Sequence, residues 1–224
     1  MWILNFKLIK KEKLTSDVFE LTFENKEELE QKPGQFITFL LPKIWWRAYS
    51  ILENNKNNIK LIIKRLENWR WWSKFICDSE IWDILNWVWP AGHFILQENH
   101  KNKLFLWTWT WFVPLYNQII SSIQKKLDIK LKLIFWVRNF SDLFYIKELE
   151  NLKKENKNFD FELFLSREKI DWINLGYITD FLVKENTENF EEFYICWMPD
   201  MIDSSIEKLK YLWILDENIF IEKY

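Results

Sequence analysis

Two polar stretches in the first half of the 224-residue chain hold residue types that bind phosphate. In "RAYS", Arg47 carries a forked donor that suits a phosphate, and Tyr49 offers a flat ring for stacking. Further along, "WRWWS" ends in Ser73, directly before the helix-like segment "SKFICDS". The Ser73 hydroxyl could donate to an anion at the start of that helix. The alternative interpretation is structural: a solvent-facing arginine, a core tyrosine and an N-cap serine.

A third stretch, "LFLWTWTWFVPLY", places tryptophan at every second position where a strand gives way to a helix. Alternation predicts that the three indoles lie on one face of a strand, as an aromatic platform or as a wide stripe of core. The intervening Thr108 and Thr110 would line a ligand or simply end the strand. Cys196 closes a later apolar run, where a lone cysteine is by default a small buried apolar residue.

The secondary-structure elements that must position these residues show two different sequence patterns, one in each half of the chain. Up to about residue 97, short β-rich runs alternate with turns, which favours an antiparallel barrel or sandwich. After the polar linker "QENHKNK", apolar runs alternate with helix-like segments at 113–126, 141–154, 177–184 and 201–212. That alternation is typical of a doubly wound parallel sheet. We therefore predict two domains, a β-barrel over residues 1–98 and an α/β domain over residues 99–224.

The glycine and tryptophan contents are both unusual. An average chain of this length holds roughly 16 glycines, whereas this one has 3 Gly and 16 Trp. Several tryptophans stand where glycine normally marks a turn, as in "KIWWRAY", "NWRWWSK", "NWVWPAG" and "ICWMPD". Such turns need a residue that tolerates positive φ, which glycine does without strain.

These contents lead to the hypothesis that UGA codes for glycine in this gene and has been read as tryptophan. The abundance of Lys, Asn, Ile and Phe indicates an AT-rich gene, in which UGA is common. The alternative is a genuinely Trp-rich protein. Its indoles would fill the turns and present aromatic faces to sugars, bases or peptides.

Charge and hydropathy argue against several classes of protein. A formal net charge of -2 argues against a broad nucleic-acid interface. No run approaches 18 apolar residues and the start lacks a signal-peptide core, so we expect a cytoplasmic protein without membrane insertion. Cys77 and Cys196 lie far apart in the sequence, with only His93 and His100 to assist them. We therefore predict no metal or iron–sulfur site.

In order and spacing, the motifs resemble those of the ferredoxin-NADP reductase superfamily over nearly the whole chain. "RAYS", preceded by "PGQF", is similar to the family's R-x-Y-S flavin motif, and "WRWWS" to the glycine-rich segment that holds the flavin diphosphate. "WPAGHF" resembles the G-P-x-G-x-F turn, "WTWTWFVP" the nicotinamide-dinucleotide loop, "IFWVR" the F-G-x-R strand end, and "CWMPDM" the C-G-x-P motif. The departures are mostly Trp for Gly, which supports the recoding hypothesis.

The resemblance implies bound FAD and a set of site residues. It places Ser50 near flavin N5 and Cys196 against the nicotinamide. The residues it implies for FAD are Arg47, Ala48, Tyr49, Ser50, Trp71, Trp72 and Ser73. Those it implies for the dinucleotide are Trp107, Thr108, Trp109, Thr110, Trp111, Pro114, Arg138, Ser166, Arg167, Cys196, Trp197, Met198 and Pro199.

Two further features bear on the same implied site. By resemblance, the terminal Tyr224 would stack on the flavin and Glu222 would join the proton and charge network; the alternative is a frayed tail. Ser166 and Arg167 follow a predicted strand, and plant-type reductases hold the 2′-phosphate with a similar pair. The pair favours NADP(H) over NAD(H), although relatives that use NADH also carry it.

The function that the resemblance implies is hydride transfer from NAD(P)H to FAD, with electrons passing on to a separate acceptor. No ferredoxin-type cysteine set or haem ligand is fused to the chain, so we expect ferredoxin or flavodoxin as that acceptor. A free-flavin reductase and an electron-transfer subunit of a larger complex are the enzymatic alternatives. If the tryptophans are real, the alternative is a Trp-lined binding module.

Overall fold

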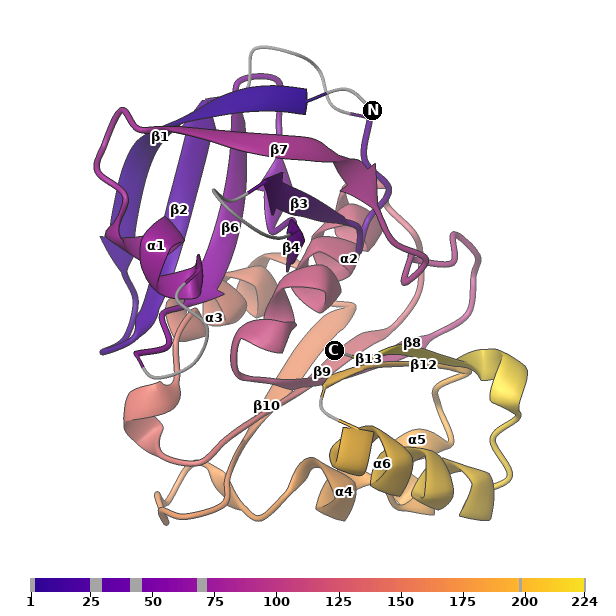
Figure 1. Cartoon of the computed structure of the whole chain (residues 1–224). Coiled ribbons are helices and arrows are strands. Elements are labelled where there is room, and N and C mark those ends of the chain that lie inside the picture. The colour runs from indigo at the N-terminus through magenta and orange to yellow at the C-terminus, as the bar shows by residue number, and fades with distance from the viewer. Residues whose placement is uncertain (1–2, 25–29, 41–45, 68–71, 198, 224) are drawn as a thin grey trace. The chain divides into compact units, whose positions relative to one another are not determined.

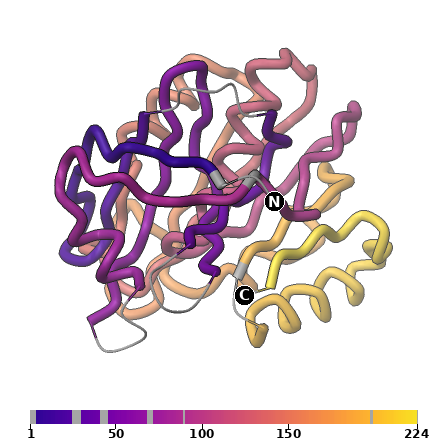
Figure 2. The backbone as a smooth tube through the Cα atoms, turned by 45° about the horizontal axis from the view of Figure 1, so that its top comes forward, coloured from indigo at the N-terminus to yellow at the C-terminus, as the bar shows by residue number. Residues whose placement is uncertain are grey.

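A computed structural model describes residues 3–24, 30–40, 46–67, 72–197 and 199–223; the remaining residues are grey in Figures 1 and 2. The chain divides into two compact units, one of residues 1–96 with 116–118 and one of residues 97–115 with 119–224. The first unit holds an antiparallel sheet and the second a parallel sheet with helices. This arrangement confirms the fold class predicted from the sequence.

The first unit is one curled seven-stranded sheet with a short helix, α1 (Trp72–Asp78), that precedes its last strand (Figure 1). The strand order is β4-β3-β7-β1-β2-β6-β5, and neighbouring strands run antiparallel. Its strands are β1 (Ile3–Lys13), β2 (Val18–Glu24), β3 (Phe36–Leu40), β4 (Trp46–Ser50), β5 (Glu53–Asn54), β6 (Asn58–Lys64) and β7 (Ile84–Ala91).

The core of the first unit is aromatic at its centre. Trp87 of β7 is fully buried and stacks on Phe6, with ring centroids 4.4 Å apart. It also meets the edges of Phe23 and Phe39, each with a centroid separation of 4.8 Å. These inward residues come from four strands of the sheet, because alternation along each strand sends every second side chain to the same face. Cys77 of α1 is buried in the same cluster.

Burial raises the pKa of Cys77 from 9.0 to about 12. Because the folded pKa exceeds the unfolded one, this thiol's contribution to stability is complete below pH 9 and is lost as the pH rises towards 12. Within that window each pH unit costs about 1.4 kcal/mol of unfolding free energy. We expect urea denaturation curves to show this alkaline loss, and Cys77→Ala to make it shallower. An unchanged slope in Cys77→Ala would contradict the assignment to this thiol.

The second unit is a six-stranded parallel sheet of order β11-β10-β9-β8-β12-β13. Helices α2 and α3 lie on one face and α4, α5 and α6 on the other (Figure 1). Because helices cover both faces of the sheet, β8 is buried along its whole length.

The strands are β8 (Lys103–Thr108), β9 (Leu131–Val137), β10 (Phe159–Leu165), β11 (Asn174–Leu175), β12 (Glu192–Trp197) and β13 (Ile219–Lys223). The helices are α2 (Phe112–Gln124), α3 (Ile146–Glu155), α4 (Ile178–Phe181), α5 (Lys184–Thr187) and α6 (Pro199–Tyr211), with single 3-10 turns η1 (Trp109–Trp111), η2 (Phe140–Asp142) and η3 (Asp216–Asn218).

Two of the four helices differ from their predicted bounds. The segment expected to be helical from 141 becomes α3 only at Ile146, because Tyr145 adopts a left-handed conformation with φ 63°. The helix expected over 177–184 is two short helices, with Leu182 and Val183 outside helical geometry between them. The predictions for α2 and α6 agree with the structure to within two residues at each end.

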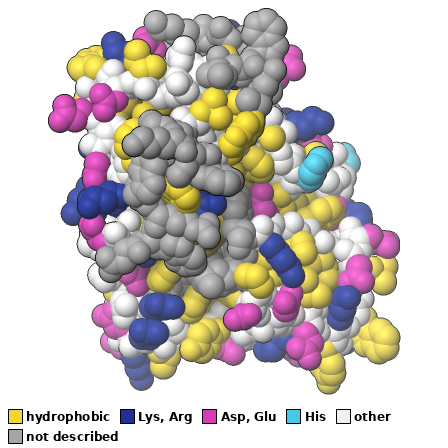
Figure 3. Space-filling model, viewed as in Figure 1, with side chains coloured by type: hydrophobic (Ala, Val, Ile, Leu, Met, Phe, Trp, Pro, Cys, Tyr) yellow, Lys and Arg dark blue, Asp and Glu magenta, His cyan; other side chains and the backbone are white. Residues whose placement is uncertain are grey.

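The surface carries both signs of charge. On the face that Figure 3 presents, Lys and Arg side chains are interspersed with Asp and Glu. Among the described residues, no helix has both the length and the apolar character needed to span a membrane.

Candidate functional site

The parallel sheet reverses its winding direction between β8 and β12. From β8 the chain moves outward through β9 and β10 to β11, and then returns to place β12 on the other side of β8. In such sheets, ligands bind outside the carboxyl ends of the strands at this switch point. The residues at that edge are therefore the first candidates for a binding site.

Thr108 and Cys196 stand at the carboxyl ends of these two strands. Thr108 is completely buried, and its hydroxyl has no hydrogen-bond partner among the described residues. Buried polar groups are normally satisfied, so this hydroxyl is a donor and acceptor that a ligand could engage. Cys196 lies with its Sγ 3.8 Å from Oε2 of Glu222 on β13, and burial raises its pKa well above 9.0. The structure thus brings Thr108, Cys196 and Glu222 to one edge with a protonated thiol.

Indoles occupy the end of β8 and the turn that follows it. Trp107 ends the apolar run and is sandwiched between Phe112 and Phe135, with ring centroids 3.7 Å from each. Trp109 and Trp111 lie in the 3-10 turn η1 and pack against the core cluster that includes Leu104 and Leu106. The prediction that all three indoles share one strand face is wrong, because the strand ends at Thr108 and the chain then turns. Thr110, in the same turn, is half-buried.

Two arginines meet at the carboxyl ends of β9 and β10. Arg138 follows β9, and its guanidinium carbon lies 4.9 Å from the ring centroid of Trp109. Arg167 follows β10, and its backbone N–H donates to the carbonyl of Arg138 over 3.0 Å. Both side chains are exposed, and Ser166 between the strand and Arg167 is half-buried. The pair gives this edge of the sheet a local positive charge, suited to a phosphate.

Glu168 was not singled out from the sequence. Its carboxylate Oε2 accepts a hydrogen bond of 2.7 Å from the backbone N–H of Phe140. This contact ties the bend after β10 to the turn η2, so it orders the segment that carries Arg167. Its position three residues beyond the end of β10 was the only sequence signal for it.

The other predicted residues of this unit include two prolines and a tryptophan near the ends of helices and strands. Pro114 is buried in the first turn of α2, and Pro199 is the exposed first residue of α6, both positions that proline tolerates because the N–H there has no helical partner. Trp197 ends β12. Met198 and Tyr224 lie outside the described residues.

In the first unit, the "RAYS" residues form β4 and pair with β3. Ala48 lies opposite Thr38, and Ser50 is the last residue of the strand. Tyr49 meets the ring of Phe39 edge-on at 5.7 Å, and burial raises its pKa. The guanidinium carbon of Arg47 lies 5.3 Å from the ring centroid of Trp72, at the first position of α1. Arg47 therefore faces an indole where the family resemblance implies a diphosphate.

Ser73 is the second residue of α1 and is buried. Its hydroxyl oxygen accepts a hydrogen bond of 3.1 Å from the backbone N–H of Leu66, which connects the start of α1 to the residues just after β6. The preceding Trp71 lies outside the described residues. The structure thus brings Arg47 and Ser73 to neighbouring elements and leaves their ligand role as a prediction.

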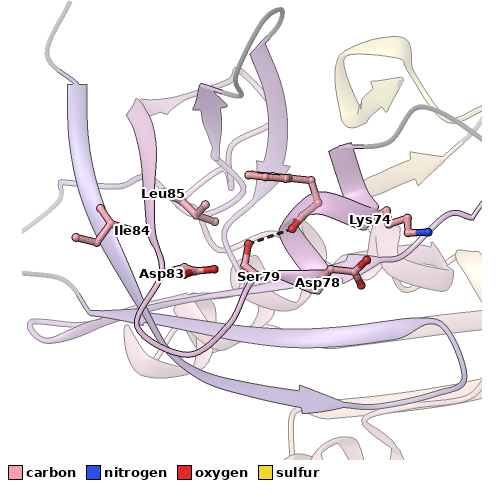
Figure 4. A pocket seen from close by; sticks show the side chains of 7 residues that line it. Lys74, Asp78, Ser79, Asp83, Ile84 and Leu85 are labelled. Carbon is pink, nitrogen blue, oxygen red and sulfur yellow. Dashed lines mark hydrogen bonds between the residues drawn. The ribbon is translucent and has the colours of Figure 1, made fainter.

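A cavity of about 520 Å³ lies at the other end of α1 (Figure 4). Its polar wall includes Lys74, Asp78, Ser79 and Asp83. The Ser79 hydroxyl donates to the carbonyl of Phe75 over 3.0 Å. None of the residues predicted from the sequence lines this cavity.

The chain is similar to known oxidoreductases in part of its sequence and in its fold. An oxidoreductase NAD-binding domain matches residues 110–206, which begin in the turn after β8. A ferredoxin NADP+ reductase from Neisseria gonorrhoeae solved with FAD and NADP aligns with 99% of the chain and 98% of its own, with a TM-score of 0.85 at 18% identity. The ferredoxin-NADP+ reductase of Plasmodium falciparum with 2'P-AMP aligns with 99% of the chain and 96% of its own, with a TM-score of 0.84 at 21% identity.

Residues 110–206 thus match an oxidoreductase NAD-binding domain, and the chain has the fold of ferredoxin-NADP reductases. A curated relative, a subunit of the Na(+)-translocating NADH-quinone reductase of Histophilus somni, is 30% identical over 145 residues, which are 60% of this chain. The match spans 35% of that relative, so the chain corresponds to about a third of its length.

A buried ionic network lies at the opposite edge of the parallel sheet and was not predicted from the sequence. Lys103 and Glu192 begin β8 and β12, face each other in register, and join Nζ to Oε2 over 2.7 Å while almost fully buried. Asn99 accepts from Lys103 over 2.8 Å, and the Tyr194 hydroxyl donates to Glu192 over 2.9 Å. The backbone N–H of Gln97 donates to the same hydroxyl over 3.0 Å. The signal was available, since opposite charges open two adjacent apolar strands.

Proposed function

We propose that the protein is an NAD(P)H-dependent flavin oxidoreductase, with FAD on the first unit and the dinucleotide on the second. The observation that carries the proposal is the switch point between β8 and β12, where the buried Thr108 hydroxyl has no partner among the described residues. When bound, the two cofactors supply hydride transfer from nicotinamide to flavin. The protein's part is to bind, orient and exclude water.

On the first unit, Arg47 and Ser73 would hold the FAD diphosphate, and Ala48, Tyr49 and Ser50 would line the flavin. The strand β4 presents Arg47 beside the start of α1, where the Ser73 hydroxyl accepts a hydrogen bond from the backbone N–H of Leu66. A guanidinium and a helix start are both suited to a diphosphate. The residues fit the group except at Trp72, whose indole lies beside the guanidinium.

On the second unit, the turn after β8 would receive the pyrophosphate, and Thr108 and Cys196 would line the nicotinamide. Cys196 contributes a neutral surface there, because burial raises its pKa and keeps it protonated. Glu222, 3.8 Å away, would connect the thiol to a proton network. The carboxyl edge of the sheet fits a dinucleotide. The indoles of Trp109 and Trp111, however, lie in the turn where the pyrophosphate would approach the backbone N–H groups closely.

We further propose NADPH as the preferred donor, held at its 2′-phosphate by Ser166 and Arg167. A charge-assisted hydrogen bond from Arg167 contributes about 1.5–3 kcal/mol, so Arg167→Ala should raise the KM for NADPH by roughly 10- to 100-fold. The KM for NADH should change little, because NADH lacks that phosphate. Steady-state kinetics with both donors measures the ratio, and Lys169→Ala, two residues beyond, is the matched charge control. Equal losses with both donors would contradict the assignment.

For the electron acceptor we propose a separate ferredoxin or flavodoxin. A second candidate, an electron-transfer subunit of a larger complex, is favoured by the relative that is itself a subunit of an NADH-quinone reductase. Purification from native extract distinguishes the two: a free-standing reductase elutes alone and reduces added ferredoxin, whereas a subunit copurifies with partners. A free-flavin reductase would instead reduce added flavin without either protein.

The direct test of the proposal is the absorbance spectrum of the purified protein. A flavoprotein is yellow, and its flavin bands bleach when NADPH or NADH is added without oxygen. A colourless protein that neither takes up added FAD nor oxidises NAD(P)H would contradict the proposal. It would favour instead a Trp-lined binding module, in which exposed indoles such as Trp46 and Trp172 contact the ligand.

A further inference from the structure

The backbone singles out certain tryptophans independently of any cofactor motif. Among the described residues, five that are not glycine have positive φ, and three of these are Trp82, Trp109 and Trp213. Tryptophan makes up 16 of the 224 residues, so three of five is a strong excess. The chain's 3 glycines also all have positive φ. A bulky residue in this region is a genuine outlier, whereas glycine adopts it readily.

Trp213 occupies the position that follows a helix. α6 ends at Tyr211, Trp213 has φ 64°, and the N–H of Ile214 donates to the carbonyl of Leu209 over 3.0 Å. This is the Schellman arrangement, in which the left-handed residue is usually glycine. The indole is 91% exposed, so packing does not hold the residue in that conformation.

Trp82 occupies the third position of a β-turn. The N–H of Asp83 donates to the carbonyl of Glu80 over 3.1 Å, and Trp82 between them has φ 86°. A positive φ at this position calls for glycine or asparagine. The Trp82 side chain is also 62% exposed, with Lys7 above its ring at 4.2 Å.

Trp109 opens the turn between β8 and α2 with φ 45°. It is the one member of the three that lies in the proposed cofactor site. The other two belong to turns outside that site. Tryptophan therefore has positive φ both inside the proposed cofactor site and in turns outside it.

We propose that positions 82, 109 and 213 are glycine in the protein that the source cell makes, because its ribosomes read UGA as glycine. Misreading of a codon places the wrong residue wherever glycine is used, so it explains why Trp accumulates at positive φ in unrelated turns. A functional tryptophan platform explains none of these placements. This inference holds whether or not the protein binds FAD or NAD(P)H.

The test is peptide mass spectrometry of the protein purified from its source cells. Cleavage after lysine releases the peptide 211–223, in which Trp213 is the only tryptophan, and the peptide 75–101, which contains Trp82. A mass and fragment series with glycine at 82 and 213, matched by UGA codons in the gene, is the expected result. Tryptophan at either position, or UGG codons there, would overturn the inference.

A second measurement checks the backbone argument on recombinant protein. Trp213→Gly should raise the melting temperature above that of the chain with tryptophan, whereas Trp213→Ala should not, because alanine shares the strain at φ 64°. Trp46→Gly is the control: Trp46 is also exposed, at 55%, but lies in a strand, where glycine destabilises. Equal effects of glycine and alanine at 213 would contradict the argument, and neither readout depends on cofactor binding.

Discussion

Glycine at positions 107, 109 and 111 together is expected to strengthen NAD(P)H binding by roughly 100-fold over the chain with tryptophan. The triple change Trp107→Gly, Trp109→Gly and Trp111→Gly frees backbone N–H groups in the turn after β8 to approach a pyrophosphate at the start of α2. Two such charge-assisted bonds, each about 1.5–3 kcal/mol, account for at least that factor. Isothermal titration with NADPH and with NADH measures it.

Stability must be followed alongside affinity, because Trp107 is fully buried between Phe112 and Phe135. Its removal alone leaves a cavity, and large-to-small core changes cost about 3–5 kcal/mol for an indole. The double change at 109 and 111 leaves that stack intact and should give part of the gain in affinity. Glycine at 82 and 213 is the control that should raise stability without changing affinity. Tight dinucleotide binding by the chain with tryptophan would contradict this prediction.

The fold was predictable because its signals are local and repeated. Alternating short strands gave the antiparallel half, and apolar runs separated by helical segments gave the parallel half. The predicted start of α3 was wrong because one residue decides it. Tyr145 adopts a left-handed conformation, which hydrophobic periodicity does not reveal, and α3 therefore begins only at Ile146. The segment after Tyr177 is split at Leu182 and Val183, where no proline or glycine in the sequence marks a break.

The candidate site was predictable only as far as strand order could be inferred. Motif order placed Thr108 and Cys196 at strand ends, and the sheet brings those ends together at the switch point. The contact of Cys196 with Glu222 depends on the register between β12 and β13, which the sequence does not specify. The indoles were the main error, since alternation assumes that the strand continues beyond Thr108, where η1 begins.

We expect removal of the Lys103 ammonium to destabilise the protein more than any other single substitution outside the hydrophobic core. Lys103→Met leaves the Glu192 carboxylate almost fully buried without its cation, and breaking such a pair costs about 3–5 kcal/mol. Burial lowers the pKa of Lys103, while the bond to Glu192 acts in the opposite direction and helps to keep the ammonium charged. Urea denaturation of the purified variant measures the change in unfolding free energy.

Two control variants distinguish the effect of breaking the buried ion pair from the effect of removing any lysine charge. Lys153→Met breaks an exposed pair with Asp160 and should cost less than about 1 kcal/mol. Lys103→Met combined with Glu192→Met removes both charges and should recover most of the loss, because matched apolar side chains can replace a buried ion pair at little cost. Since Asn99 and Tyr194 also bond to the pair, the single variant should loosen the segment from residue 97 to 101 as well. A Lys103→Met protein no less stable than Lys153→Met would show that the network does not hold this segment to the sheet.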